Sequence, residues 1–220
     1  ISSELTINYK RRLYEPCREF AAGEIERAIE RLKPGDVVMI STWLNRQLGD
    51  IHANGLVNDF PIFHQGKAIS LSQAREIYVR EMRQLAHRLS RSGLELLLVV
   101  DVPSLARHPL ACEAWSGVLP GLDGLKRCSP DPSVTRAMQQ QVQTMLAAIA
   151  EDQPNVHVFD PTDQLLEGSD WLLHKSADGT LKYVDKHHIG YSASYALGPS
   201  FREFLQRRGL ASPYRDPLVR

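Results

Sequence analysis

"LELLLVVDVP", residues 94–103, is the stretch that decides the fold. An unbroken apolar run of strand length, 96–100, suits a strand buried on both faces of a parallel sheet. The run ends at Asp101. An earlier stretch, "GDVVMIST" (residues 35–42), and a later one, "NVHVFDP" (residues 155–161), have the same character. The three runs together predict a core of buried parallel strands.

Helical periodicity fills the segments between these strands. Residues 18–32 place Ile25, Ile29 and Leu32 on one face, and Pro34 ends that pattern. The other apolar stripes are Tyr78, Met82, Leu85 and Leu89 in residues 70–92; Met138, Val142, Met145 and Ile149 in a helix capped by Ser133; and Tyr195, Phe201, Phe204 and Leu205 in a last helix. Asp178-Gly179 predicts a hairpin turn. Alternating strands and helices predict an α/β fold, a three-layer α/β/α sandwich with a mainly parallel sheet.

The bulk composition is that of an ordinary globular domain. The chain has 220 residues, of which 43% are hydrophobic and 24% charged. Its 26 basic residues balance 26 acidic ones, so no basic surplus attracts nucleic acid. The longest apolar run, residues 96–100, is far too short to cross a bilayer.

Three cysteines are present. Cys112 and Cys128 flank a loop rich in proline and glycine, and the spacing is not that of a zinc site. They are either two unrelated thiols or a disulfide, and we expect the disulfide, which implies an oxidising compartment. Cys17 is then unpaired, or its partner precedes Ile1.

Residues 183–192, "YVDKHHIGYS", carry the clearest chemical signal. A histidine that transfers a proton near neutral pH needs a partner to fix its tautomer and stabilise its cation. Asp185, three residues before His188 in a turn that enters a helix, can reach the ring. Two other interpretations compete: Asp185 is a helix cap, or Asp185, His187 and His188 bind a metal. No further histidine or carboxylate stands nearby at a matching spacing, and we expect no metal.

The stretch "NVHVFDPTDQLL…SADGTLKYVDKHHIGYSASYAL" resembles the closing segment of SGNH hydrolase-like domains, of the type fused to membrane acyltransferase-3 O-acetylases of cell-surface polysaccharide. Its strand ending in Asp-Pro, its Asp-Gly hairpin, Tyr183 and the Asp-x-x-His motif all match. "YEPCREF", "GDVVMISTW" and "LLLVVDVP" support the similarity over residues 14–205. The order Ile-Gly-Tyr-Ser after His188 departs from the family's Leu-Ser followed by a glycine.

The resemblance implies an SGNH or flavodoxin-like sheet and a Gly-Asp-Ser nucleophile motif after its first strand. No such strand precedes residue 36, and "LGDIHANGL" (residues 48–56) has Ile51 where the serine would stand. We therefore expect residues 1–208 to be one domain truncated before its nucleophile, and residues 209–220 to be a tail. A decayed nucleophile is the alternative, and Ser41 is a weaker candidate for the role.

The resemblance also implies roles for individual residues. In the intact protein, His188 oriented by Asp185 would activate an upstream serine, and Asn45 is a candidate oxyanion donor. The serine would pass an acyl group, expected to be acetyl, to a polysaccharide hydroxyl without a cofactor. A membrane-embedded acyltransferase domain would be the partner, at the periplasmic or extracellular face. The alternatives are a non-catalytic module that binds a glycan or a partner, and a free-standing esterase.

Overall fold

The structure is a computed structural model that describes residues 5–7, 23–27, 29–50, 52–53, 61–116 and 126–210. Its centre is a parallel sheet of three strands in the order β2–β5–β6, which are Val37–Ser41, Glu95–Val99 and Val156–Phe159. Val37 pairs with Glu95, and Leu96 pairs with Val156. These are the three apolar runs of the sequence, so the predicted parallel core is confirmed.

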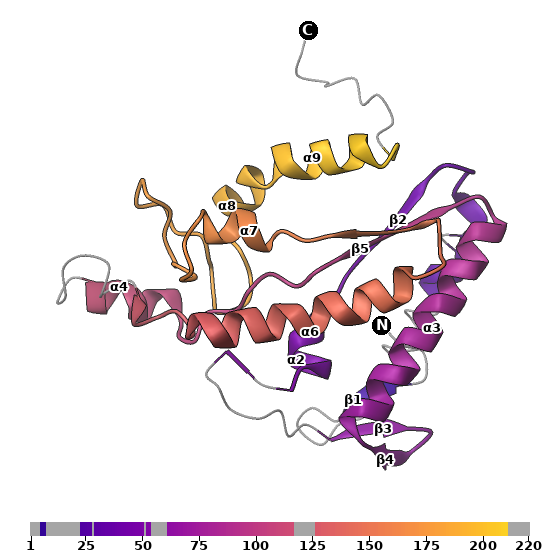
Figure 1. The fold of residues 1–220 in the computed structure, drawn as a ribbon, viewed down its shortest axis with the longest axis horizontal. Helices are drawn as coiled ribbons and strands as arrows, with labels where there is room; N and C mark the ends of the chain where they lie inside the picture. The colour runs from indigo at the N-terminus through magenta and orange to yellow at the C-terminus, as the bar shows by residue number, and fades with distance from the viewer. Residues whose placement is uncertain are drawn as a thin grey trace, which may run out of the picture.

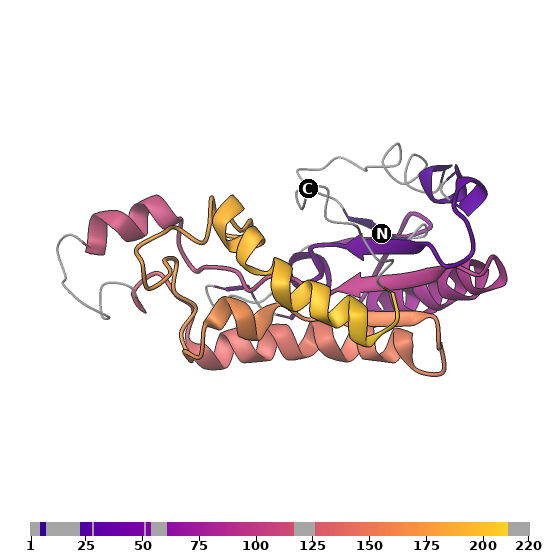
Figure 2. The same cartoon turned by 90° about the horizontal axis from the view of Figure 1, so that it is seen from above.

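Helices cover both faces of this sheet (Figure 1). On one face, α3 (Leu71–Arg91) and α6 (Pro132–Ala150) pack against Leu96 and Leu98 of β5. On the other, α9 (Gly198–Arg207) packs Phe204 against Leu97 and Phe159. Figure 1 shows the strands running between α9 and α6, and Figure 2, seen from above, shows α9 in front. Successive side chains of β5 thus pack into two cores, one on each face of the sheet. The predicted three-layer sandwich is confirmed.

The predicted helices form with small changes at their ends. Residues 23–27 and 29–31 are helical, as expected from Ile25 and Ile29. Ser70 begins α3 with a capping box that includes Gln73. The predicted cap of α6 is wrong: Asp131 accepts from the Ser133 amide, and Ser133 lies inside the first turn behind Pro132. A proline at the first helical position leaves the cap to the residue before it.

The predicted last helix is two helices, α8 (Tyr191–Ala196) and α9. The break falls at Leu197, and Pro199 stands in the first turn of α9, where its missing backbone donor is tolerated. As a result the Tyr195 side chain is 75% exposed instead of joining Phe204 in the core. The predicted hairpin at Asp178-Gly179 is a turn with a single bridge, between Lys175 and Leu181.

Strand β2 differs from its expected surroundings. The sequence predicts burial on both faces, yet the Met39 side chain is 58% exposed. In the described part of the sheet β2 is an edge strand, with β5 on one side. Val38 and Ile40 pack into the core beneath α3 and α6, while α9 lies over β5 and β6 and leaves Met39 open.

A second, antiparallel sheet was not predicted. It has the order β1–β3–β4, from Leu5–Ile7, Ile62–His64 and Lys67–Ile69. Gln65 and Gly66 join β3 to β4 with φ of 49° and 76°. Positive φ at both central residues is typical of the tight turn that matches strand twist. The Gln-Gly pair in the sequence was therefore an available signal.

No helix in the described segments has both the length and the apolar character needed to span a membrane. Residues 211–220 of the predicted tail lie outside the described residues. Cys17 and Ile51 also lie outside them.

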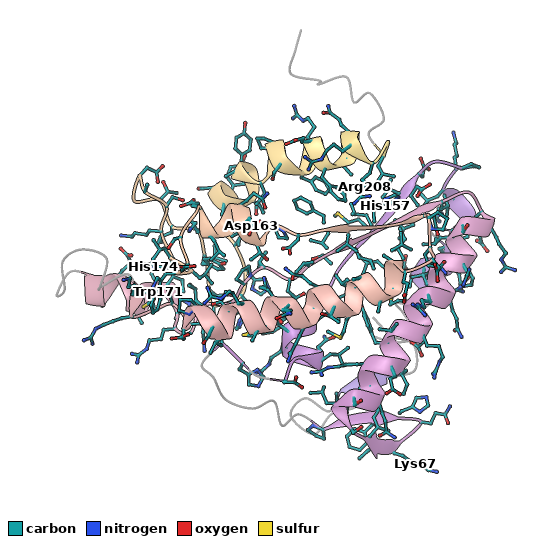
Figure 3. All side chains as sticks on the ribbon, in the orientation of Figure 1. Lys67, His157, Asp163, Trp171, His174 and Arg208 are labelled. Carbon is teal, nitrogen blue, oxygen red and sulfur yellow. A yellow bond between two sulfur atoms is a disulfide. The ribbon has the colours of Figure 1, made fainter. Side chains whose placement is uncertain are left out.

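The structure contains the expected disulfide between Cys112, in α4 (Pro109–Ser116), and Cys128, with 5.5 Å between their Cα atoms. Both cysteines are fully buried. Glu113, next to the bridge, contacts His174 Nε2 through its Oε1 at 2.7 Å. Figure 3 places His174 and Trp171 beside α4. The disulfide and this contact hold α4 and the 171–175 loop at one end of the sheet.

Removing the disulfide is expected to destabilise the domain. Cys112→Ala with Cys128→Ala reopens a loop of 16 residues, which costs about 3 kcal/mol in the chain-entropy account. Urea unfolding of the two proteins measures the difference. Dithiothreitol should shift the wild-type midpoint and leave that of the double variant unchanged; equal shifts would contradict the bridge. Free alkylation of both cysteines without reductant would also contradict it.

Candidate active site

A buried polar network joins the carboxyl ends of all three parallel strands. After β2, the backbone N–H of Asn45 in α2 (Leu44–Leu48) donates to Asp101 Oδ2 at 2.6 Å. Asp101 follows β5. Gln139 of α6 donates from Nε2 to the Asp101 carbonyl at 2.8 Å, and to Thr162 Oγ1 at 3.0 Å at the start of α7 (Thr162–Leu166), after β6. These contacts fix the strand ends and the helices after them as one rigid edge.

Asp101 is the charged member of this network. Burial raises its pKa to about 6, although hydrogen bonds from the Asn45 and Leu44 backbone oppose the rise. A buried carboxylate is costly unless hydrogen bonds compensate it. Sequence analysis did not single out Asp101, although a polar residue directly after a buried strand marks the functional edge of a parallel sheet.

The raised pKa predicts a pH dependence of stability. Between about pH 4 and pH 6, folded Asp101 holds a proton that the unfolded carboxyl has already lost. The stability that this group contributes is therefore complete below pH 4 and is lost as the pH rises through about 6. A shift from 3.8 to about 6 corresponds to about 3 kcal/mol.

Asp101→Asn removes this titration and serves as the reference. Urea unfolding of both proteins from pH 4 to pH 7 should show wild type losing stability relative to Asp101→Asn across the window. Parallel curves for the two proteins would contradict the raised pKa.

The segment with the histidine pair is attached to this edge. The Tyr183 hydroxyl, fully buried, donates to the Pro103 carbonyl at 2.7 Å, in the loop after β5. The Leu105 amide donates to the Lys186 carbonyl at 2.8 Å. Residues 183–189 close on themselves, with the Val184 amide bonded to the His188 carbonyl at 3.0 Å. The turn is therefore anchored over the carboxyl end of β5.

Asp185 and His188 are in direct contact. His188 Nδ1 and Asp185 Oδ2 are 2.7 Å apart, and because a carboxylate only accepts, the ring N–H donates. Asp185 Oδ1 accepts from the His187 and His188 amides, each at 2.8 Å. One carboxylate thus caps the turn and holds the ring. The predicted helix cap is not observed, because α8 begins at Tyr191 with Gly190 at its N-cap. Whether the pair is catalytic stays a prediction.

Electrostatics keep Asp185 ionised. Partial burial raises its pKa, but hydrogen bonds from the His187 amide, the His188 ring and the His188 amide outweigh that effect and bring the pKa to about 2. The His188 side chain is 70% exposed, and its Nε2 has no partner among the described side chains. The arrangement is an imidazole with a fixed tautomer and an outward Nε2, the geometry a general base requires.

The His187 ring contacts a different residue, Trp43, with centroids 4.1 Å apart and planes tilted by 41°. Burial lowers its pKa, which keeps the ring neutral near pH 7. The two rings line a pocket of about 100 Å³, together with Asn45, Arg46, Ser104 and Lys186 among others.

Asn45 lines that pocket from below and is almost fully buried. Its Nδ2 donates to Gln139 Oε1 at 3.0 Å, and its Oδ1 has no partner among the described residues. One of its amide hydrogens is thus engaged in the network. Whether Asn45 serves as the oxyanion donor stays a prediction.

Two other possibilities from the sequence were Ser41 as the nucleophile and a metal site. Ser41 ends β2 and is exposed. The described residues contain no cluster of three histidine, cysteine or acidic side chains able to hold a metal ion.

Comparison with known families agrees with this geometry. The family model described as the SGNH domain fused to AT3 (acyltransferase-3) domains matches residues 3–203. No curated protein and no solved structure gives a significant match. SGNH hydrolase-type domains are generally esterases or acyltransferases, and the name of this family implies fusion to a membrane acyltransferase domain. With a parallel three-strand sheet between helices and a family match over nearly its whole length, the chain belongs to the SGNH domains of the kind fused to acyltransferase-3 domains.

Proposed function

We propose that this domain transfers an acyl group, expected to be acetyl, to a hydroxyl of a cell-surface polysaccharide. A Ser-His-Asp triad would carry the reaction, with His188 and Asp185 from this chain and the serine from sequence before Ile1. The observation that carries the proposal is the 2.7 Å contact between His188 Nδ1 and Asp185 Oδ2 at the carboxyl edge of the sheet. The family match supports the reaction class.

The chemistry follows from the exposed Nε2 of His188. The serine hydroxyl attacks the carbonyl carbon of the acyl donor and gives its proton to Nε2. The imidazolium, stabilised by Asp185, returns that proton to the leaving group of the donor. A sugar hydroxyl then attacks the acyl-serine, loses its proton to Nε2 and leaves as the ester, and the serine regains its proton. With water in place of the sugar, the same steps give hydrolysis.

The outer edge of β2 is a suitable place for the strand that carries the serine. The apolar sequence of β2 is that of an interior strand, and the open Met39 lies where a further parallel strand and its helix would cover it. A serine at the carboxyl end of such a strand lies on the same edge as Asn45 and His188. Asn45 Nδ2 or the backbone beside it would then stabilise the oxyanion.

The partner we propose is a membrane-embedded acyltransferase domain in the same full-length chain, which delivers the acyl group. The carbohydrate acceptor would meet the domain at the periplasmic or extracellular face, where the Cys112–Cys128 disulfide is stable. The site described requires no cofactor for this chemistry.

A fluorophosphonate probe, which labels activated serines, tests the proposal in the full-length protein. We expect one labelled peptide, from the sequence before Ile1, and no label after heat denaturation. Label on Ser41 would place the nucleophile within the present chain. A folded protein with no labelled serine would overturn the triad.

One observation favours a second candidate, a non-catalytic module that binds glycans. No serine hydroxyl contacts His188 in the part of the chain that the structure describes. In that case the turn at Asp185 serves only as a structural cap. The same labelling experiment separates the two candidates, because a non-catalytic module would have no labelled serine. A free-standing esterase would be labelled but would lack the membrane domain.

A further inference from the structure

A second pocket, of about 220 Å³, lies between α7, the 176–182 turn and α8. It shares no lining residue with the pocket beside His187. Its polar lining comes from Gln164, Glu167, Ser176, Asp178, Thr180, Lys182 and Ser192, and its apolar lining from Leu165, Ala193, Ala196 and Leu197. Nothing in the proposed acyl transfer uses this pocket.

A buried lysine distinguishes the pocket from a simple surface hollow. Lys182 is 3% exposed, and its Nζ donates to the Leu165 carbonyl at 2.8 Å. Its second contact is an ion pair with Glu167 Oε2 at a longer 3.4 Å. An ammonium has three donors, and the described residues supply these two acceptors. A buried charge is costly unless it is fully hydrogen-bonded, so an acceptor from a ligand would complete this site.

The other lining groups indicate what kind of ligand fits. Glu167 and Asp178 add two carboxylates against the single charge of Lys182, so the lining as a whole repels anions. Carboxylates accept hydrogen bonds, the ammonium donates them, and the hydroxyl and amide groups do both. The lining also includes the apolar side chains of Ala193, Ala196 and Leu197. This combination matches an uncharged molecule with several hydroxyls and one apolar face, such as a sugar ring.

Helix α8 adds an independent feature. Tyr191 and Tyr195, one turn apart, are 84% and 75% exposed. Their rings stack with centroids 6.3 Å apart and planes 23° from parallel. Exposed aromatic residues gathered on one surface mark interaction sites more often than isolated ones do. The pair stands on the helix that walls the pocket and directly follows the His188 turn.

We propose that this pocket binds an uncharged sugar unit of a polysaccharide, and that the tyrosine pair on another face of the same helix contacts a neighbouring unit. The site would hold the polymer at a distance from His188 and raise its local concentration there. The proposal rests on the proposed function only in taking the ligand to be a glycan. Binding at this site needs no nucleophile, so it is measurable whether or not acyl transfer occurs.

The experiment uses the full-length protein on an array of neutral and acidic oligosaccharides. We expect binding to neutral members. Ser192→Phe, which fills the pocket, should weaken that binding at least about tenfold, a loss of about 1.4 kcal/mol. Ser194→Phe is the matched control, because Ser194 is exposed on the same helix but does not line the pocket. Equal thermal midpoints of the two variants would show that neither substitution disturbs the fold.

Four results would overturn the proposal: no neutral glycan bound, a preference for acidic glycans, equal effects of the two phenylalanine substitutions, or tyrosine-dependent binding to phosphatidylglycerol vesicles in place of glycans. A protein that binds neutral glycans through Ser192 but shows no labelled serine would keep this inference and lose the proposed acyl transfer. Labelling without glycan binding would do the reverse.

Discussion

His188→Ala in the full-length protein is expected to lower polysaccharide acylation by about 10⁴-fold or more. In the proposed mechanism, the substitution removes the group that takes the proton of the attacking serine. The domain should remain folded, because the side chain is largely exposed and its one hydrogen bond is to Asp185. Acyl transfer to purified polysaccharide, followed by mass spectrometry, measures the loss.

His108→Ala is the control for this change. His108 is also exposed and also makes one local contact, accepting from the Leu110 amide through Nδ1. It should retain full acylation. If His188→Ala retained near-normal acylation with unchanged expression, the catalytic assignment would be wrong.

Asp185→Asn should cost nearly as much activity, about 10⁴-fold in kcat. An asparagine oxygen can still accept from the His187 and His188 amides, so the turn survives. Its amide group, however, cannot stabilise the imidazolium, and a donated Nδ2 hydrogen would favour the wrong tautomer of His188. KM should change little, because Asp185 does not line either pocket.

Asp131→Asn provides the matched comparison. Like Asp185, Asp131 accepts from the amide two residues on, at 2.8 Å, but it does so at the start of a helix and contacts no histidine among the described residues. Both variants should lose similar, small amounts of stability, while only Asp185→Asn loses activity. Equal activity of the two variants would reduce Asp185 to a structural cap.

The sequence predicted those features that depend on neighbours along the chain. Apolar runs located β2, β5 and β6, and helical stripes located α3 and α6. The contact of Asp185 with His188 was predictable because three residues in a turn bring the two side chains together. The disulfide was predictable from the loop rich in proline and glycine that its two cysteines flank.

Features that depend on distant partners were not predictable. The Asn45 side chain meets Gln139 across 94 positions, and no local pattern marks such a pair. The exposure of Met39 depends on where α9 lies, and the pocket around Lys182 depends on how α7 and α8 meet. In each case the residue pattern is compatible with a buried and an open environment, and tertiary packing decides between them.

The turn around Asp185 ties local order to chemical competence. One carboxylate oxygen accepts from the backbone of the turn and the other accepts from the ring, so a single side chain holds both. A fluctuation that opens the loop also frees the imidazole to rotate. If His188 is the catalytic base that we propose, proton transfer would occur only from the closed conformer. A docking polymer or an adjoining domain that presses on this loop would then change the turnover rate without touching the reacting atoms.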